Sequence, residues 1–268
     1  MINSFEGGYR ERPEKKQYGE ILEDRSKIFH GIGFDLIRLK KILDNGILSE
    51  KAAVDRGVDI TRNYGGYNLN DSISVGESPV IHGTHTFGAF KNYIANGISF
   101  VIDGVPAYKA KKGSERDSGY IDEAYVSHSI SREKIVGIMV PEEILDLPLS
   151  KIPVGLAKMG YSYIDNRCRK IIQDLAQECN FADDVSELED IMRQKAELEE
   201  SNLEYLEKDG QRRKIFTQME EFMQGYISKA YSKKLNIPNP TLRNTLFHQI
   251  PQEMSLYNSD GFPITIEK

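Results

Sequence analysis

The chain is poor in cysteine and has no long apolar run. Among its 268 residues there is no tryptophan, and Cys168 and Cys179 are its two cysteines. Two thiols are too few for a disulfide framework or for a zinc site of their own, so we expect both to be reduced. No stretch of about 18 apolar residues is present, and the first residues, Met1–Phe5, lack the apolar core of a secretory signal. These absences predict a soluble chain that acts in a cytosol and has no membrane partner.

The charge is acidic and is concentrated in one segment. The net charge is −6, which argues against a nucleic-acid partner because phosphates attract basic surfaces. Residues 183–214 hold 11 acidic and 6 basic residues, so this segment accounts for nearly all of the net charge. The 11 Phe and 14 Tyr residues, with 39% hydrophobic residues overall, predict a folded chain rather than a disordered one.

Helical periodicity dominates the second half of the sequence. Apolar residues recur at helical spacing within 155–180. The charged segment 183–214 has no proline, only Gly210 interrupts it, and apolar residues continue at helical spacing behind it. This pattern predicts two long helices. Four prolines in 236–268 predict an irregular tail with one helical turn around 242–247.

The first half combines strand and helix signals. Residues 98–102 and 135–140 are short β-branched runs bounded by Gly, Asp or Pro, which is typical of buried strands. Residues 35–45 read as a helix with Asp35 as N-cap and Gly46 as C-cap, and residues 86–95 as a second helix. The sequence therefore predicts an α+β unit followed by helices.

Three short pieces of the α+β unit carry polar groups in a distinctive order. The first is His30-Gly31, followed by a helix and the turn Ile42-Leu43-Asp44-Asn45-Gly46. The second is Asp-Ser-Ile-Ser-Val at 71–75, before the second helix and its strand. The third is Tyr-Ile-Asp-Glu-Ala-Tyr-Val at 120–126, ahead of a strand that includes Ile135.

In this order the pieces resemble the ADP-ribosyltransferase superfamily, in particular its diphtheria-toxin and poly(ADP-ribose)-polymerase-like branch. The resemblance covers roughly Ile28 to Pro141. It implies an ADP-ribosyltransferase-like split β-sheet in a catalytic domain over residues 8–149, with NAD held in a cleft between two small sheets. A mainly helical domain with an irregular tail would follow over residues 150–268.

The resemblance also implies roles for single residues. Breaking the bond between nicotinamide and ribose develops an oxocarbenium-like cation, which the carboxylate of Glu123 would stabilise. His30 would hydrogen-bond the ribose on the adenosine side of NAD. Gly31 would grip the nicotinamide amide through its backbone, where a larger side chain would block the cofactor.

The ring that stacks on nicotinamide is the point where the sequence departs from the branch. The middle strand of the branch has a tyrosine, whereas this chain has Ser72-Ile73-Ser74. We expect Tyr93 to stack on nicotinamide, with Tyr67 as the second candidate, and Ser74 to support Glu123 or the pocket wall.

The activity that the resemblance implies is NAD-dependent mono-ADP-ribosylation of a protein target. NAD would be the substrate, and the basic loop 107–119 would dock the target. A bacterial toxin or effector, secreted into a host cell and acting on a host protein in its cytosol, would fit this activity. The helices would either cap the catalytic unit or form a partner-binding arm, with the helix over 183–209 pairing in a hairpin with the next one.

Other interpretations remain open. RNA 2′-phosphotransfer on the same fold would need a cluster of Arg and His residues, and a non-enzymatic scaffold would need no site at all. His82 and His85 could share a metal if they lay on one helix, but no third ligand has a recognisable spacing, so no metal site is predicted. The second His-Gly pair, His82-Gly83, also lacks an Ile-Leu-x-x-Gly turn behind it, which favours His30.

Overall fold

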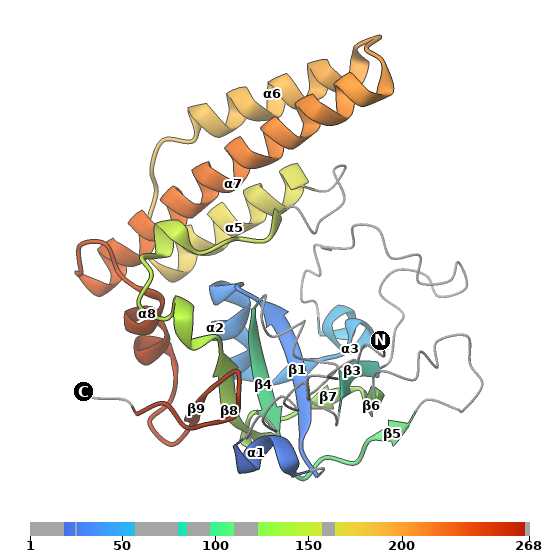
Figure 1. Ribbon diagram of the computed structural model, residues 1–268, viewed down its shortest axis with the longest axis vertical. Helices are drawn as coiled ribbons and strands as arrows, with labels where there is room; N and C mark the ends of the chain where they lie inside the picture. Colours follow the sequence, from blue (N-terminus) through green and yellow to red (C-terminus); the bar gives the residue numbers. More distant parts are fainter. Residues whose placement is uncertain are drawn as a thin grey trace, which may run out of the picture.

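A mixed sheet and a group of long helices make up the structure (Figure 1). The computed structural model describes residues 19–24, 26–56, 80–84, 97–109, 123–156 and 164–265. Within these residues the strands of the main sheet follow the order β5-β6-β3-β1-β4-β8-β9, and β2 pairs with β7 in a second, two-stranded sheet. The strands are β1 (Ile28–Gly33), β2 (Ile47–Leu48), β3 (Val80–Thr84), β4 (Ile98–Ile102), β5 (Tyr108–Lys109), β6 (Glu123–Ser127), β7 (Ser129–Ile130), β8 (Ile135–Val140) and β9 (Ser255–Asn258).

The longest helices lie together on one side of this sheet and extend beyond it (Figure 1). Three short 3-10 turns, η1 (Arg132–Lys134), η2 (Glu142–Ile144) and η3 (Leu149–Lys151), flank β8. The α-helices are α1 (Glu20–Glu23), α2 (Leu36–Asn45), α3 (Glu50–Asp55), α5 (Ile164–Glu178), α6 (Ser186–Glu200), α7 (Tyr205–Leu235) and α8 (Leu242–Gln249). The expected α+β class is therefore confirmed.

Local signals explain α2, which follows β1. The side chain of Asp35 accepts a hydrogen bond of 2.9 Å from the backbone N–H of Arg38, which satisfies one of the free donors at the helix start. Gly46 ends the helix, and its N–H donates to the carbonyl of Ile42. Both predicted caps of this helix are confirmed.

The central strands bury both of their faces. On one face Phe29, Val101 and Met139 pack together with α1. On the other face Phe100 and Ile138 belong to the main apolar core, which also contains the buried side of α2. Alternation along a strand explains this arrangement, because neighbouring residues of β1 or β4 point to opposite faces. The predicted strands 98–102 and 135–140 are confirmed as β4 and β8.

The two long helices of the second half are confirmed, but their boundary differs from the expected one. The break between α6 and α7 lies at residues 201–204, and Gly210, the expected interruption, lies inside α7. An exposed glycine costs a helix only about 1 kcal/mol relative to alanine, a deficit that the packing of α7 can outweigh. The predicted helix in 155–180 appears as α5, described over Ile164–Glu178.

The C-terminal segment is more ordered than expected. The predicted helical turn is the two-turn helix α8, whose capping box joins Thr241 and Asn244. The remainder was expected to be irregular, yet β9 pairs in parallel with β8, with Leu256 opposite Ile138. The prolines that suggested irregularity, Pro251 and Pro263, lie outside β9 and leave its hydrogen bonds intact.

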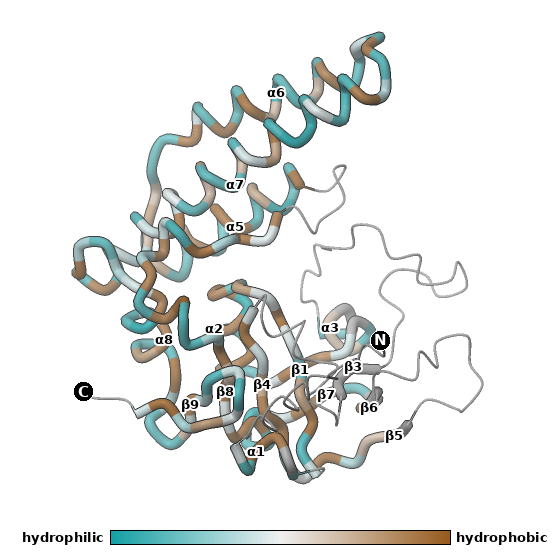
Figure 2. Tube along the Cα trace, in the orientation of Figure 1, coloured by the Kyte–Doolittle hydropathy of each residue, from teal (hydrophilic) through white to brown (hydrophobic). Residues whose placement is uncertain are grey.

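The helices are amphipathic rather than uniformly apolar. Figure 2 shows hydrophilic and hydrophobic residues alternating along α5, α6 and α7. Among the described residues, no helix combines the length and the apolar character that crossing a bilayer requires.

Candidate functional site

The His-Gly pair lies within the central strand β1. His30 is half-buried and pairs with Phe100 of β4, while Gly31 is exposed and pairs with Ser99. The family pattern has this pair at the end of its strand, whereas here β1 continues to Gly33. The first piece of the predicted site thus lies in the middle of the sheet, on a strand with partners on both sides.

Glu123 begins β6, two strands away from β1. The register aligns Phe29 of β1 with Thr84 of β3, and Thr84 with Glu123. Because neighbouring strands lie about 4.8 Å apart, roughly 10 Å separates the backbone of Glu123 from that of β1. The sheet therefore brings the strands that carry His30 and Glu123 close together, although the two residues are far apart in sequence. Glu123 shares its row with Phe29, one position out of step with His30, and because neighbouring positions of a strand face opposite sides of the sheet, the rows of Glu123 and His30 belong to opposite faces.

The second His-Gly pair lies between these two strands. His82 and Gly83 are part of β3 and pair with Tyr125 and Ala124 of β6. The condition considered for a metal site, two histidines on one helix, is not met, since His82 belongs to a strand. Within the described part of the chain, no group of three or more His, Cys, Asp or Glu side chains could hold a metal ion.

Ser99 is a polar residue of this region that the sequence analysis did not single out. It lies opposite Gly31, is fully buried, and its hydroxyl has no hydrogen-bond partner among the described residues. A polar side chain inside the otherwise apolar strand Ile98–Ile102 was the available signal. Since buried hydroxyls are usually paired, an unpaired one opposite Gly31 is an unusual polar position in the sheet.

Three of the predicted NAD-binding residues, Tyr67, Ser74 and Tyr93, lie outside the described residues, as does the predicted helix 86–95. The predicted docking loop 107–119 is described only as far as residue 109. Its first part, β5, pairs with β6 and places Lys109 opposite Ala124, next to Glu123.

Ion pairs fix the start of β1 to the end of β4. Nζ of Lys27 lies 2.7 Å from Oδ2 of Asp103 and 3.1 Å from Oδ2 of Asp24. The hydrogen bond to Asp103 raises the pKa of Lys27, and the same bond lowers the pKa of Asp103. Hydrogen bonds from Ser26 and Lys27 lower the pKa of Asp24 to about 2. All three groups are therefore charged at neutral pH, and they link the residue before β1 to the residue after β4.

The close approach of β1 and β4 near the site requires glycine. A Cβ on Gly97 would lie 2.3 Å from the Cα of Gly33. Real Cβ atoms essentially never come so close to a backbone atom. A side chain at position 97 would therefore push the two strands apart and disturb their register around Gly31.

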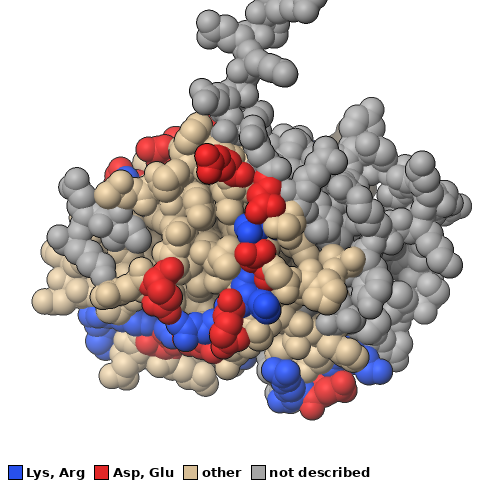
Figure 3. Space-filling view, turned by 90° about the horizontal axis from the view of Figure 1, so that it is seen from below, with Lys and Arg blue, Asp and Glu red and all other residues tan. Residues whose placement is uncertain are grey.

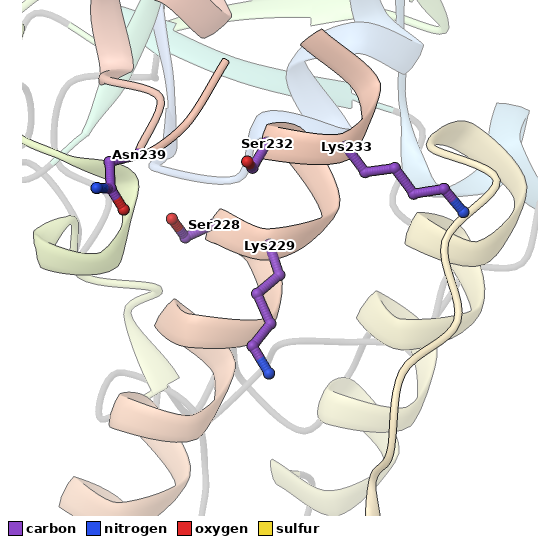
Figure 4. A pocket seen from close by; sticks show the side chains of 5 residues that line it. All are labelled: Ser228, Lys229, Ser232, Lys233 and Asn239. Atoms are coloured by element: carbon purple, nitrogen blue, oxygen red, sulfur yellow. The ribbon is translucent and has the colours of Figure 1, made fainter. Parts of the chain in front are cut away.

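A separate hollow of about 300 Å³ lies on α7, away from these strands. Figure 4 shows the hydroxyls of Ser228 and Ser232 near Asn239, while Lys229 and Lys233 extend away from them. Both ammonium groups are engaged elsewhere, Lys229 with Asp183 at 2.8 Å and Lys233 with the carbonyl of Asn180 at 2.6 Å. The hollow therefore offers hydroxyl and amide groups but no free charge.

The described surface carries charges of both signs. On the face in Figure 3, Lys and Arg residues lie close to Asp and Glu residues. Mixed charge of this kind gives an extended phosphate backbone no continuous basic track on the described part of that face.

Comparisons of the chain with protein-family models, with curated proteins and with solved structures found no match. What the chain does is therefore inferred from its residues and from their arrangement.

Proposed function

We propose that the chain is an NAD-dependent mono-ADP-ribosyltransferase that acts on a protein target, with Glu123 as its catalytic residue. The proposal includes an ADP-ribosyltransferase-like form of the α+β fold, in which NAD binds over β1, β3 and β6. It also includes the toxin or effector role that the resemblance implies.

The reaction has a simple balance. The bond between C1′ of the ribose and the ring nitrogen of nicotinamide breaks, and its electron pair neutralises the pyridinium nitrogen. The ribosyl cation that develops at C1′ is stabilised by the carboxylate of Glu123, which interacts more strongly with this cation than with ground-state NAD. A nucleophile of the target then bonds to C1′ and gives up its proton.

One observation supports this proposal above the others. The strand order β6-β3-β1 brings Glu123 within two strands of His30-Gly31, although 93 positions separate Glu123 from His30. Opposite Gly31, Ser99 adds a fully buried hydroxyl that has no hydrogen-bond partner among the described residues.

The test is release of nicotinamide from NAD by the full chain. We expect the wild type to release nicotinamide, and Glu123→Gln to lower the rate about 100-fold or more, as losses of transition-state stabilisation do. Glu143→Gln is the matched control, because Glu143 is an exposed carboxylate next to β8, away from the row of Glu123, and the rate should not change. Gly31→Val should weaken binding of NAD by filling the space beside the backbone.

Two results would contradict the proposal. The first is nicotinamide release that stays undiminished in Glu123→Gln. The second is a complete lack of release by the wild type, with and without a cell lysate that could supply a target or an activator, which would favour the non-enzymatic scaffold. A crystal structure with NAD adds a geometric criterion, since Glu123 and His30 must both contact one ligand although the register puts their rows on opposite faces of the sheet.

A further inference from the structure

Two neighbouring apolar residues are exposed at the end of the α6–α7 hairpin. The side chains of Tyr205 and Leu206 are 75% and 81% exposed, whereas the next most exposed large apolar residue of the described chain, Phe262, is 40% exposed. Single exposed apolar residues need no explanation, but here two adjacent ones are both far more exposed than any other large apolar residue of the described chain. We call residues 201–206 the hairpin tip.

The hairpin tip is held firmly by its own hydrogen bonds. The backbone N–H and the hydroxyl of Ser201 both donate to the carbonyl of Leu198, at 3.2 and 2.7 Å. Nζ of Lys208 donates to the carbonyl of Glu199 at 2.7 Å, which satisfies a free acceptor at the end of α6. Arg212 grips the carboxylate of Glu199 with two bonds of 2.9 and 2.6 Å. These bonds tie the end of α6 to the first turns of α7, on either side of the exposed pair.

Free negative charge surrounds the pair. Residues 197–209 contain six carboxylates and one lysine, and that lysine is Lys208. The nearest arginines are also engaged within the hairpin, Arg212 with Glu199 and Arg213 with Asp209 at 2.9 Å. The carboxylates of the exposed residues Glu200, Glu204 and Glu207 have no counter-ion among the described residues. The hairpin tip therefore presents two exposed apolar side chains within a segment of net negative charge.

Figure 1 shows where the hairpin tip lies. The turn between α6 and α7 is at the far end of the hairpin, away from the main sheet. A second molecule could approach it without meeting the sheet.

We propose that the hairpin tip is a docking site for a protein partner that offers an apolar pocket ringed by Lys and Arg residues. Tyr205 and Leu206 would fill the pocket, since a few central apolar and aromatic anchors carry most of the binding energy of an interface. The carboxylates around them would face the basic rim. The same charge disfavours the other occupants, because an anionic membrane and a second copy of the tip would both be repelled. The inference does not depend on the enzymatic activity proposed above.

A photocrosslinking experiment followed by titration tests this proposal. The full chain carrying Leu206→p-benzoylphenylalanine is irradiated in a lysate of the organism that makes it and in a eukaryotic lysate, with Leu147→p-benzoylphenylalanine as the control. Leu147 is an apolar residue outside the hairpin and is 39% exposed. The captured protein is identified, its crosslinked surface is mapped, and it is purified for titration.

We expect the crosslink to fall in an apolar pocket with Lys or Arg residues at its rim. The dissociation constant should rise about tenfold or more in Leu206→Ala and in Tyr205→Ala, as for truncated anchors, and stay unchanged in Leu147→Ala. Raising the salt concentration from 50 to 500 mM should weaken binding and slow association, because the Debye length falls from about 14 to about 4 Å and screens the charge complementarity.

Four results would overturn the proposal. The first is that no protein is captured beyond those in the Leu147 control, and the second is a crosslink only to a second copy of the chain. The third is binding to vesicles of phosphatidylserine and phosphatidylcholine. The fourth is a partner that binds the wild type and Leu206→Ala with the same affinity. Circular dichroism of each variant shows whether the hairpin is still folded, and Leu206→Met, which keeps an apolar side chain, should retain most of the affinity.

Discussion

Two glycines should respond to alanine in opposite directions, because one lies against backbone and the other in open space. Gly46 ends α2 with φ 79° and ψ −175°, a combination that is essentially restricted to glycine. A Cβ there would lie 2.2 Å from the carbonyl oxygen of Ile130 in β7. Gly210 lies in the second turn of α7, is exposed, and has nothing within 4 Å of its would-be Cβ.

The magnitudes follow from these surroundings. Gly46→Ala carries about 1–3 kcal/mol of backbone strain, and the collision with Ile130 forces β7 away from β2, so we expect a total loss of about 3 kcal/mol or more. Gly210→Ala gains about 0.8 kcal/mol, because alanine loses less backbone entropy in a helix. For a chain of this size these values correspond to a melting temperature about 9 °C lower for Gly46→Ala and about 2 °C higher for Gly210→Ala.

The assay is thermal unfolding followed by circular dichroism, with both variants and the wild type measured in one buffer. The expected result is a difference of about 11 °C between the two variants, with the wild type in between. A Gly46→Ala variant as stable as the wild type would show that the turn after α2 and the β2–β7 pair are not built as described. A Gly210→Ala variant that is less stable than the wild type would refute the continuous helix α7.

Further predictions concern Glu220 and the two cysteines. The carboxylate of Glu220 accepts hydrogen bonds from the backbone N–H groups of residues 154–156, at 3.0 Å for Gly155 and 2.9 Å for Leu156. Glu220→Ala should therefore lower the free energy of unfolding, measured by guanidinium titration, by about 3 kcal/mol. Glu221→Ala, at the exposed neighbour, should change it little. Burial raises the pKa of the Cys168 thiol to about 12 and that of Cys179 to about 11, so iodoacetamide at pH 8 should leave both unmodified in the native chain and alkylate both after unfolding, as read by mass spectrometry. Unfolded thiols have a pKa of about 8.5. Because the pKa values in the folded chain are higher, the free energy of unfolding should fall as the pH rises from about 8.5 towards 11.

Local chemistry made part of the fold predictable. The caps at Asp35 and Gly46 and the apolar run Ile98–Ile102 carry their signal within a few residues, and all three are confirmed. The break between α6 and α7 was misplaced because Gly210 is a weak interruption, while the actual turn at 201–204 contains neither glycine nor proline. Strand β9 was missed because it is short and its pairing partner, β8, lies more than 100 residues earlier.

The candidate site shows the same limit at the level of register. Sequence order can place a His-Gly strand before a Glu strand, but it cannot say which residues face each other across the sheet. The structure aligns Glu123 with Thr84 and Phe29, so the row of Glu123 and the row of His30 face opposite sides of the sheet. Ser99 escaped notice because its position opposite Gly31 follows only from the pairing of β1 with β4.

The sheet and the helices share one apolar core, and this links the two proposals. Buried residues of β4, α5 and α7 belong to a single cluster, and β9, which follows the helices in sequence, completes the sheet beside β8. Glu220 of α7 also holds the chain at residues 154–156, between β8 and α5. Because a close-packed interior deforms little, a partner docked on the hairpin tip would be held at a fixed place relative to β1 and β6. Binding at Tyr205 and Leu206 would then select which molecule is presented to Glu123, while leaving the release of nicotinamide from NAD unchanged.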